Sequence, residues 1–207
     1  MASAALAQES EADRNLLTSA GRGDAAAVRR AIAQGARIET RDARGRTALL
    51  VATAGHKTEA AAVLIGAGAD VNAKDDINDS PYLLAGAEGA LEILRLTLSH
   101  GADLRSTNRY GGTALIPACE RGHVETVRAL IQAGVDVDHV NNLGWTGLLE
   151  AVILGNGGPN HQEIVKILLA AGASVNLADK DRVTALQHAK AKGQDAVAAL
   201  LTAAGGR

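Results

Sequence analysis

The chain has 207 residues, a net charge of −2 at pH 7 and a hydrophobic content of 47%. This length fits one domain or one short array of repeats, and the composition is that of a globular protein. The balanced charge argues against nucleic-acid binders, which carry a clustered basic surplus. No apolar run reaches the roughly 18 residues of a membrane-spanning helix. The single cysteine, Cys119, excludes an internal disulfide framework, and the absence of Phe predicts a core of small aliphatic side chains.

Residues 1–9 are expected to be a disordered N-terminus or the remnant of a secretory leader. Ala5-Leu6-Ala7 has the small-x-small spacing of a signal-peptidase site, although no basic region or long apolar stretch precedes it. An ordinary frayed, alanine-rich terminus is the other interpretation. The leader interpretation places the mature start near Gln8 and predicts a periplasmic protein. The frayed terminus is compatible with a cytoplasmic one.

Three columns of residues repeat along the chain in one register. Turn-forming residues recur at steps of 33, 33, 33 and 38, at Asp42, Asp75, Asn108, Asn141 and Asp179. The other two columns follow the same steps and consist of Gly68, Gly101, Gly134 and Gly172, and of Ala52, Ala85, Ala118, Ala151 and Ala189. A register shared by three columns indicates a stack of structural repeats.

Residues 108–140 show the expected structure of one unit. A turn at Asn108 precedes Thr113, whose hydroxyl is expected to cap a first helix by accepting a free backbone N–H. Gly122 is expected to break that helix in a left-handed conformation, and Gly134 is expected to end a second helix. Each unit is therefore predicted to be a turn followed by two helices.

This unit resembles an ankyrin repeat, a turn and two antiparallel helices around the motif T-P-L-H-x-A. The matching tetrads are Thr47-Ala48-Leu49-Leu50, Ser80-Pro81-Tyr82-Leu83, Thr113-Ala114-Leu115-Ile116, Thr146-Gly147-Leu148-Leu149 and Thr184-Ala185-Leu186-Gln187. The resemblance covers nearly the whole chain, is closest to small stand-alone bacterial ankyrin proteins, and implies an all-α ankyrin-repeat solenoid of stacked helix pairs.

The resemblance also divides the chain. It implies an N-terminal capping helix pair at 10–41, four repeats at 42–74, 75–107, 108–140 and 141–178, and a C-terminal capping repeat at 179–207. The four repeats are called units one to four. Unit four is five residues longer than the others, and the extra residues are expected between its two helices.

Several positions depart from the family pattern. In unit one, Gly55 comes one position early and His56 takes the expected left-handed site. Asn78 and Arg182 replace the glycine found in the turns of the other units. Because a left-handed Arg costs on the order of 1 kcal/mol, Arg182→Gly is expected to stabilise the last unit. Pro117 lies about one turn into a first helix, where it removes a backbone hydrogen bond.

The resemblance implies a non-catalytic protein–protein interaction module that binds a protein partner through the concave face of its turns and first helices. Turn residues are exposed, and aromatic and Arg side chains carry most of the binding energy of interfaces. The candidate residues are Arg44, Arg46, Ile77, Asp79, Arg109, Tyr110, Leu143 and Trp145. The alternative is that Trp145 packs on a neighbouring turn and Tyr110 shields the backbone. A monomer without cofactor, nucleic-acid or membrane partner is expected, with self-assembly through the apolar turns as another possibility.

The insertion of unit four suggests a second kind of site. A Gly-rich loop at 155–161 could present backbone N–H groups to an anion or small ligand, with Glu150, Asn156 and His161 as candidate residues. The loop lacks the Lys and Ser/Thr of a phosphate loop, so a tolerated surface insertion is the other interpretation. Glu150 occupies a normally apolar position, and its carboxylate is expected to accept loop N–H groups or to pair with His188.

No residue pattern indicates catalysis or metal binding. One carboxylate begins each second helix, where the helix dipole explains it, at Glu59, Glu92, Glu125, Glu163 and Asp195. The six histidines show no spacing of three or four residues, which argues against a helical metal site. His100 is expected to interact with a helix C-terminus, and Cys119 is expected to be a small core residue. The protein is therefore not expected to be an enzyme.

Overall fold

The computed structural model describes residues 10–207, and this part of the chain contains helices joined by turns, with no named strand. The helices are α1 (Glu11–Arg22), α2 (Ala25–Ala33), α3 (Ala48–Ala54), α4 (Thr58–Gly66), α5 (Pro81–Ala87), α6 (Leu91–Ser99), α7 (Leu115–Glu120), α8 (Val124–Ala133), α9 (Gly147–Ile153), α10 (Pro159–Ala170), α11 (Ala185–Ala191) and α12 (Asp195–Ala203). The predicted all-α solenoid is confirmed.

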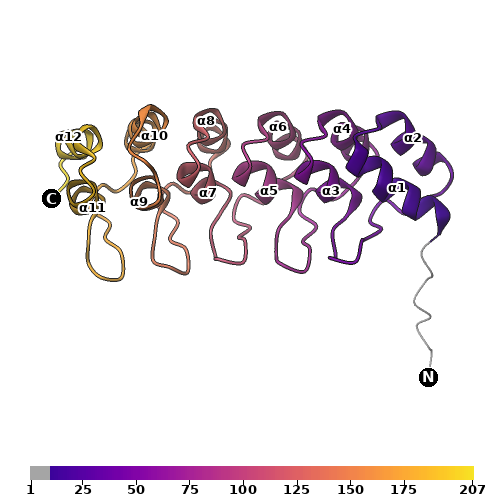
Figure 1. The fold of residues 1–207 in the computed structure, drawn as a ribbon, viewed down its shortest axis with the longest axis horizontal. Coiled ribbons are helices and arrows are strands. Elements are labelled where there is room, and N and C mark those ends of the chain that lie inside the picture. The colour runs from indigo at the N-terminus through magenta and orange to yellow at the C-terminus, as the bar shows by residue number, and fades with distance from the viewer. Residues whose placement is uncertain (1–9) are drawn as a thin grey trace, which may run out of the picture.

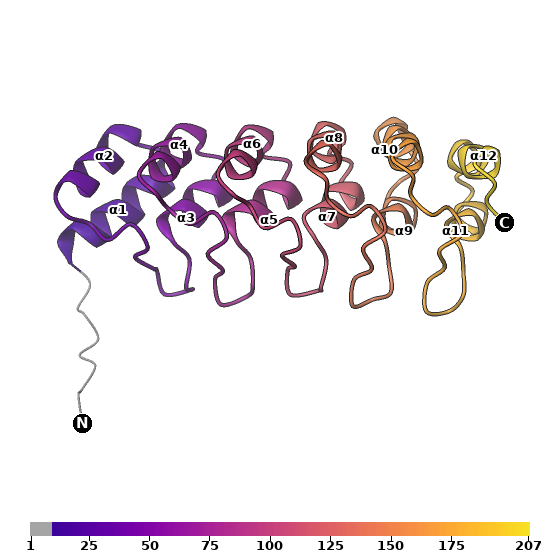
Figure 2. The same ribbon diagram turned by 180° about the vertical axis from the view of Figure 1, so that it is seen from behind.

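The helices form two parallel rows along an elongated molecule (Figure 1). The first helices of the pairs, α1 to α11 in odd numbers, make one row, and the second helices, α2 to α12, make the other. Each helix packs against its own partner and against its counterpart in the next pair. The loops that precede α3, α5, α7, α9 and α11 all project from the row of first helices, as the view from behind also shows (Figure 2).

The column of Asp and Asn residues shapes these projecting loops. Oδ1 of Asp42 accepts hydrogen bonds from the backbone N–H groups of Arg44 and Arg46, at 2.9 and 3.0 Å. The equivalent oxygens of Asp75, Asn108, Asn141 and Asp179 accept from the residues two and four positions later. We call residues 42–46, 75–79, 108–112, 141–145 and 179–183 the tips. A side-chain oxygen is required at the first position because it replaces missing backbone partners.

The left-handed residue in each tip lies where the sequence predicts it. Gly45, Gly111 and Gly144 have φ between 71° and 87°, while Asn78 and Arg182 have φ of 65° and 63°. The inter-helix turn of unit one follows the same prediction, because His56 has φ 53°. Arg182 therefore keeps a conformation that L side chains avoid.

The expected cap at Thr113 is wrong. In units one and four, Thr47 and Thr146 accept the backbone N–H three residues later, but the Thr113 hydroxyl is buried without a hydrogen-bond partner. The reason is Pro117, which has no N–H to bond to the Thr113 carbonyl. Helix α7 therefore begins two residues after Thr113, at Leu115, and the Thr113 carbonyl accepts from Ile116 at 3.3 Å instead.

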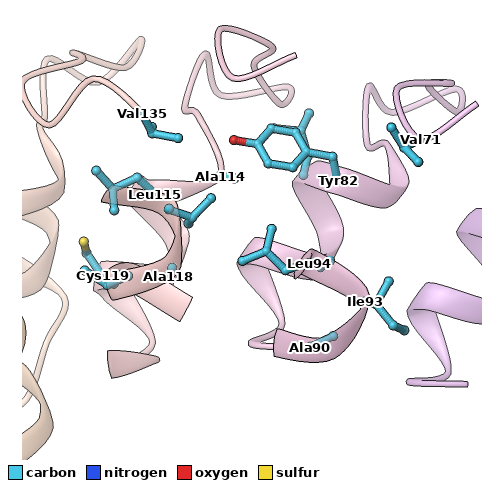
Figure 3. Close-up of a cluster of buried hydrophobic side chains, with 14 of the residues drawn as sticks. Val71, Tyr82, Ala90, Ile93, Leu94, Ala114, Leu115, Ala118, Cys119 and Val135 are labelled. Atoms are coloured by element: carbon cyan, nitrogen blue, oxygen red, sulfur yellow. The ribbon is translucent and has the colours of Figure 1, made fainter. Parts of the chain in front are cut away.

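Small aliphatic side chains fill one continuous core through the stack, as the composition predicts. Figure 3 shows a part contributed mainly by units two and three, with Val71 from unit one, where Tyr82, Leu94, Leu115 and Cys119 lie among alanines and valines. The repeated alanines Ala52, Ala85, Ala118, Ala151 and Ala189 are at most 1% exposed. Because they have no more than a methyl group, the helices of neighbouring units approach closely.

The predicted leader remnant or disordered terminus at 1–9 lies outside the described residues and stays a prediction. Among the helices that are described, none is long and apolar enough to span a membrane.

Candidate functional site

A groove runs between the tips and the row of first helices. It consists of two adjoining hollows that share Asp79 and Leu84. The smaller, of about 350 Å³, lies between units one and two and includes Arg44 and Arg46. The larger, of about 400 Å³, extends over units two to four and includes Tyr110. The tips therefore form one wall of the groove, and the first helices form its floor.

Three consecutive tips carry a large apolar side chain at the same position. Ile77, Tyr110 and Leu143 are separated by 33 residues and are 51%, 54% and 47% exposed. We call these three residues the tip row. The guanidinium of Arg109 lies 4.8 Å from the centre of the Tyr110 ring, a cation–π distance that orients the ring. All three side chains border the groove, so the tip row is an apolar edge along one wall.

One position on the floor of the groove is apolar in units two and three and carries a carboxyl group in unit four. Leu84, Pro117 and Glu150 occupy equivalent positions on α5, α7 and α9 and all line the larger hollow. Leu154, 49% exposed, follows α9 at the end of the same hollow. Glu150 is thus a carboxyl group where units one to three have a hydrocarbon side chain.

Arginines of unit three neutralise the carboxylates of unit two in the groove. Arg109 Nη1 lies 3.3 Å from Asp79 Oδ2, and Arg121 Nη1 lies 2.6 Å from Glu88 Oε1. Arg121 also donates to the Ala87 carbonyl at the end of α5. These pairs connect successive units along the groove and balance the charges at that end.

Glu120 and Glu150 are the two carboxylates of the larger hollow that have no ion pair among the described residues. Glu150 is 5% exposed, and its Oε1 accepts one hydrogen bond, from Asn141 Nδ2 at 2.8 Å. Burial, with a further contribution from the negative charge of Glu120, raises the pKa of Glu150 from 4.5 to about 7. The fourth unit therefore holds a buried acid that no cation within residues 10–207 neutralises.

Other candidate residues differ in exposure. Arg44 is exposed at the edge of the smaller hollow, while Arg46 is half-buried and pairs with Asp42 at 2.7 Å. Trp145 is half-buried, packs against the core and does not line the groove. Of the two aromatic candidates, Tyr110 alone presents its ring to the groove.

The expected link from the Glu150 carboxylate to the loop is wrong. The carboxylate accepts a hydrogen bond from the Asn141 side chain. The loop N–H of Gly155 donates instead to the Glu150 backbone carbonyl, at 3.3 Å. The cause is the free carbonyl groups at the C-terminus of α9, which take the nearest N–H groups. The expected Glu150–His188 pair is also absent, because His188 Nε2 lies 2.7 Å from Asp179 Oδ2.

The loop itself is bonded to its neighbours. His161 is 7% exposed, and its two ring nitrogens lie 2.9 Å from Asn156 Oδ1 and 2.8 Å from the Glu120 carbonyl. The Gly155 carbonyl accepts hydrogen bonds from Lys192 and Gln194 of the C-terminal cap. These hydrogen bonds hold the insertion against the units on both sides. The side chains of His161 and Asn156 therefore take part in positioning the loop.

Potential reactive groups are buried or separated. Cys119 is fully buried, and its burial raises the pKa of the thiol. His100 Nδ1 lies 2.8 Å from the Leu96 carbonyl near the end of α6, as expected. Within residues 10–207, no group of His, Cys, Asp or Glu side chains could hold a metal ion.

Four further residues line the groove that the sequence pattern did not indicate, namely Glu88, Glu120, Arg121 and Leu154. They lie at the ends of first helices, away from the tips, and nothing in their own sequence neighbourhood marks them. The 33-residue register could have found them, because Arg121 and Leu154 occupy the same position in successive units.

Comparison with known proteins agrees with the geometry of the stack. The family model for ankyrin repeats in three copies matches residues 82–179, and the single ankyrin repeat matches residues 44–76. Ankyrin repeat protein YahD of Escherichia coli (strain K12) is 46% identical over 56 residues, which are 27% of this chain and 28% of that protein. The chain therefore spans less than a third of that relative's length.

Solved structures extend the similarity over nearly the whole chain. An ankyrin repeat domain from Acinetobacter baumannii AYE is 61% identical, with 93% of this chain and 98% of that chain covered and a TM-score of 0.89. A second ankyrin repeat protein is 40% identical over 92% and 97% of the two chains, with a TM-score of 0.87. The ankyrin repeat domain of Bcl-3, of the IkappaB protein family, is 27% identical over 93% and 86%, with a TM-score of 0.83. The chain belongs to the ankyrin-repeat family.

Proposed function

We propose that this protein is a non-catalytic interaction module that binds a protein partner along the groove between its tips and first helices. Ankyrin repeat domains generally mediate protein–protein interactions and are generally non-catalytic. The observation that carries the proposal for this groove is the tip row, three exposed apolar side chains on successive units beside the two adjoining hollows.

The tip row favours binding because its side chains are about half exposed and none of them belongs to the hydrophobic core. Large apolar groups about half exposed to water, next to one another, lower the free energy when a partner covers them. Tyr110 also offers a ring with few rotatable bonds, which loses little entropy on binding. The arginine pairs beside it hold the groove in one shape before the partner arrives.

The proposal is tested by comparing two double variants in a pull-down with mass spectrometry. Tyr110→Ala with Leu143→Ala truncates the tip row. Val140→Ala with Leu177→Ala truncates two side chains that are 50% and 39% exposed but lie outside the groove. A partner retained by the parent and by the control pair, and lost by the tip-row pair, is the expected result.

Two other results would contradict the proposal. A partner retained equally by all three proteins would place binding on another surface. A partner lost only from the control pair would show that the groove is not used. Circular dichroism of each variant establishes that the stack is intact before binding is compared.

A further inference from the structure

The two arginine–carboxylate pairs that line the groove join units two and three and are not repeated between units three and four. In unit three, Arg109 on the tip and Arg121 after the first helix reach back to the acids of unit two. The equivalent positions of unit four, 33 residues later, are Asn142 and Leu154. Unit four therefore supplies no guanidinium to the carboxylates Glu120 and Glu150 beside it.

Glu120 and Glu150 share one part of the larger hollow. Both side chains line it, and the negative charge of Glu120 contributes to the raised pKa of Glu150. Four carboxylates face this hollow and only two arginines, both of which are already paired with Asp79 and Glu88. The remaining negative charge is concentrated where the floor meets the fourth tip.

We propose that the groove at units three and four receives a lysine or arginine side chain from an extended segment of the partner protein, placed between Glu120 and Glu150. The proposal rests on the proposed function and specifies what the partner carries. The incoming cation takes the position that Arg121 fills one unit earlier. An apolar side chain of the same segment lies on Tyr110 or Leu143.

The surroundings of the two acids suit such a side chain. Pro117, Leu143 and Leu154 border the hollow and offer apolar surface to the methylene groups of a lysine or arginine. One carboxylate oxygen of Glu150 accepts a hydrogen bond from Asn141, and the carboxylate has no cationic partner among the described residues. A buried carboxylate without a cation is costly, so a cation supplied by the partner recovers that cost and adds a charge-assisted hydrogen bond.

The position of the acids favours a protein segment over a free cation. The tip row continues from Leu143 past Tyr110 to Ile77, so a bound chain can cover apolar surface on three units. A small cation such as a polyamine would occupy the acids and leave the tip row exposed. The combination of a localised negative charge and an apolar edge matches a segment with basic and apolar residues.

The test uses 12-residue random peptides displayed on phage and selected on the immobilised full chain. Selected peptides are synthesised, and their Kd is measured by fluorescence anisotropy on the parent and on Glu120→Gln with Glu150→Gln. The matched control is Glu59→Gln with Asp195→Asn, which removes two exposed charges from the row of second helices. In each peptide, the basic residue is also replaced by methionine.

The expected peptides contain a basic residue and an apolar one. The Glu120→Gln, Glu150→Gln protein binds them at least about 10-fold more weakly, whereas the control pair binds them as the parent does. On the parent protein, replacing the basic residue of the peptide by methionine weakens binding by a similar factor. On the double variant, the same replacement weakens binding little further, since both changes remove the same interaction.

The outcomes separate this inference from the proposed function. Peptides that need Tyr110 and Leu143 but bind the double glutamine variant unchanged would overturn the inference and leave the proposed function standing. Peptides that ignore both sets of groove variants, or no selected peptide at all, would count against both. Spermidine binding that depends on Glu120 and Glu150, without any selected peptide, would replace the protein segment by a free polyamine.

Discussion

Two buried carboxyl groups in distant parts of the stack, one in the N-terminal cap and one in unit four, behave in opposite ways. Asp13 of α1 and Glu150 of α9 are 1% and 5% exposed. Asp13 accepts the Arg37 backbone N–H at 2.8 Å and the Arg37 guanidinium at 2.8 and 3.1 Å. The pKa of Asp13 lies far below the usual range, mainly because the Arg37 side chain donates hydrogen bonds to its carboxylate. Glu150 has one amide donor and no cation within residues 10–207, and its pKa is raised to about 7.

Burial alone therefore does not decide the state of an acid in this fold. At Asp13 the chain supplies the cation from the capping pair itself, and the acid connects α1 to the turn after α2. At Glu150 the cation is missing, and the acid borders the groove. The first carboxyl group stabilises the cap, and the second costs stability at neutral pH, which is typical of groups kept for binding.

The largest effect is expected for Asp13→Asn. An amide keeps one acceptor oxygen but points N–H donors at the Arg37 guanidinium, so the network at the N-terminal cap is broken. We expect Tm to fall by about 5 °C or more. Thermal unfolding by circular dichroism checks the size, and hydrogen exchange checks that α1 and α2 open first.

The pH dependence of the same group gives a second readout. Because the folded pKa of Asp13 is lowered, its contribution to stability is present above pH 3.8 and is lost as the pH falls below that value. Asp13→Asn should remove this part of the acid dependence, while Glu11→Gln, an exposed change on the same helix, should keep it. Equal acid profiles for the parent and Asp13→Asn would contradict the assignment.

Glu150→Gln is expected to act in the opposite direction. The folded pKa of about 7 exceeds the ordinary 4.5, so the folded state binds the extra proton and the free energy of unfolding falls as the pH rises from about 4.5 to 7. The substituted amide would keep the bond from Asn141 without a charge. We expect it to raise the free energy of unfolding at pH 8 by on the order of 2 kcal/mol and to have little effect at pH 4. Denaturant unfolding at both pH values checks this.

Leu154→Arg should lower the pKa of Glu150, as Arg37 lowers the pKa of Asp13. It restores an arginine at the position that Arg121 has one unit earlier, beside Glu120 and Glu150. We expect the pKa of Glu150 to fall by roughly one unit, with Leu154→Gln as the uncharged control. Carboxyl-carbon NMR titration measures the pKa directly. An unchanged pKa would show that position 154 does not reach the acids.

Arg182→Gly gives the smallest effect and separates backbone strain from charge. Arg182 has φ 63°, where glycine is unstrained, so the substitution should raise stability by about 1 kcal/mol. Because neither buried acid is touched, the gain should be the same at pH 5 and pH 8. Arg182→Ala serves as the control, since it removes the charge and keeps the strain. A gain from Ala equal to that from Gly would assign the effect to charge.

Much of the fold follows from local sequence. The Asp and Asn column predicts the tips because one side-chain oxygen satisfies two backbone N–H groups within four residues. Left-handed positions such as His56 and Arg182 follow from the register of the glycines. The prediction failed at Thr113, where the effect of Pro117 on the first turn outweighed the capping preference.

The sequence by itself determined the repeat, its register, the alanine-rich core and the exposure of Tyr110, because these depend on residues within one unit or at fixed steps. Only the tertiary structure decided the partners of Glu150 and His188, the half-buried position of Trp145 and the pairing of Arg109 and Arg121 with acids of the preceding unit. Those interactions join side chains from different turns of the chain. Their energies depend on distance and burial, which arise when the units stack against one another.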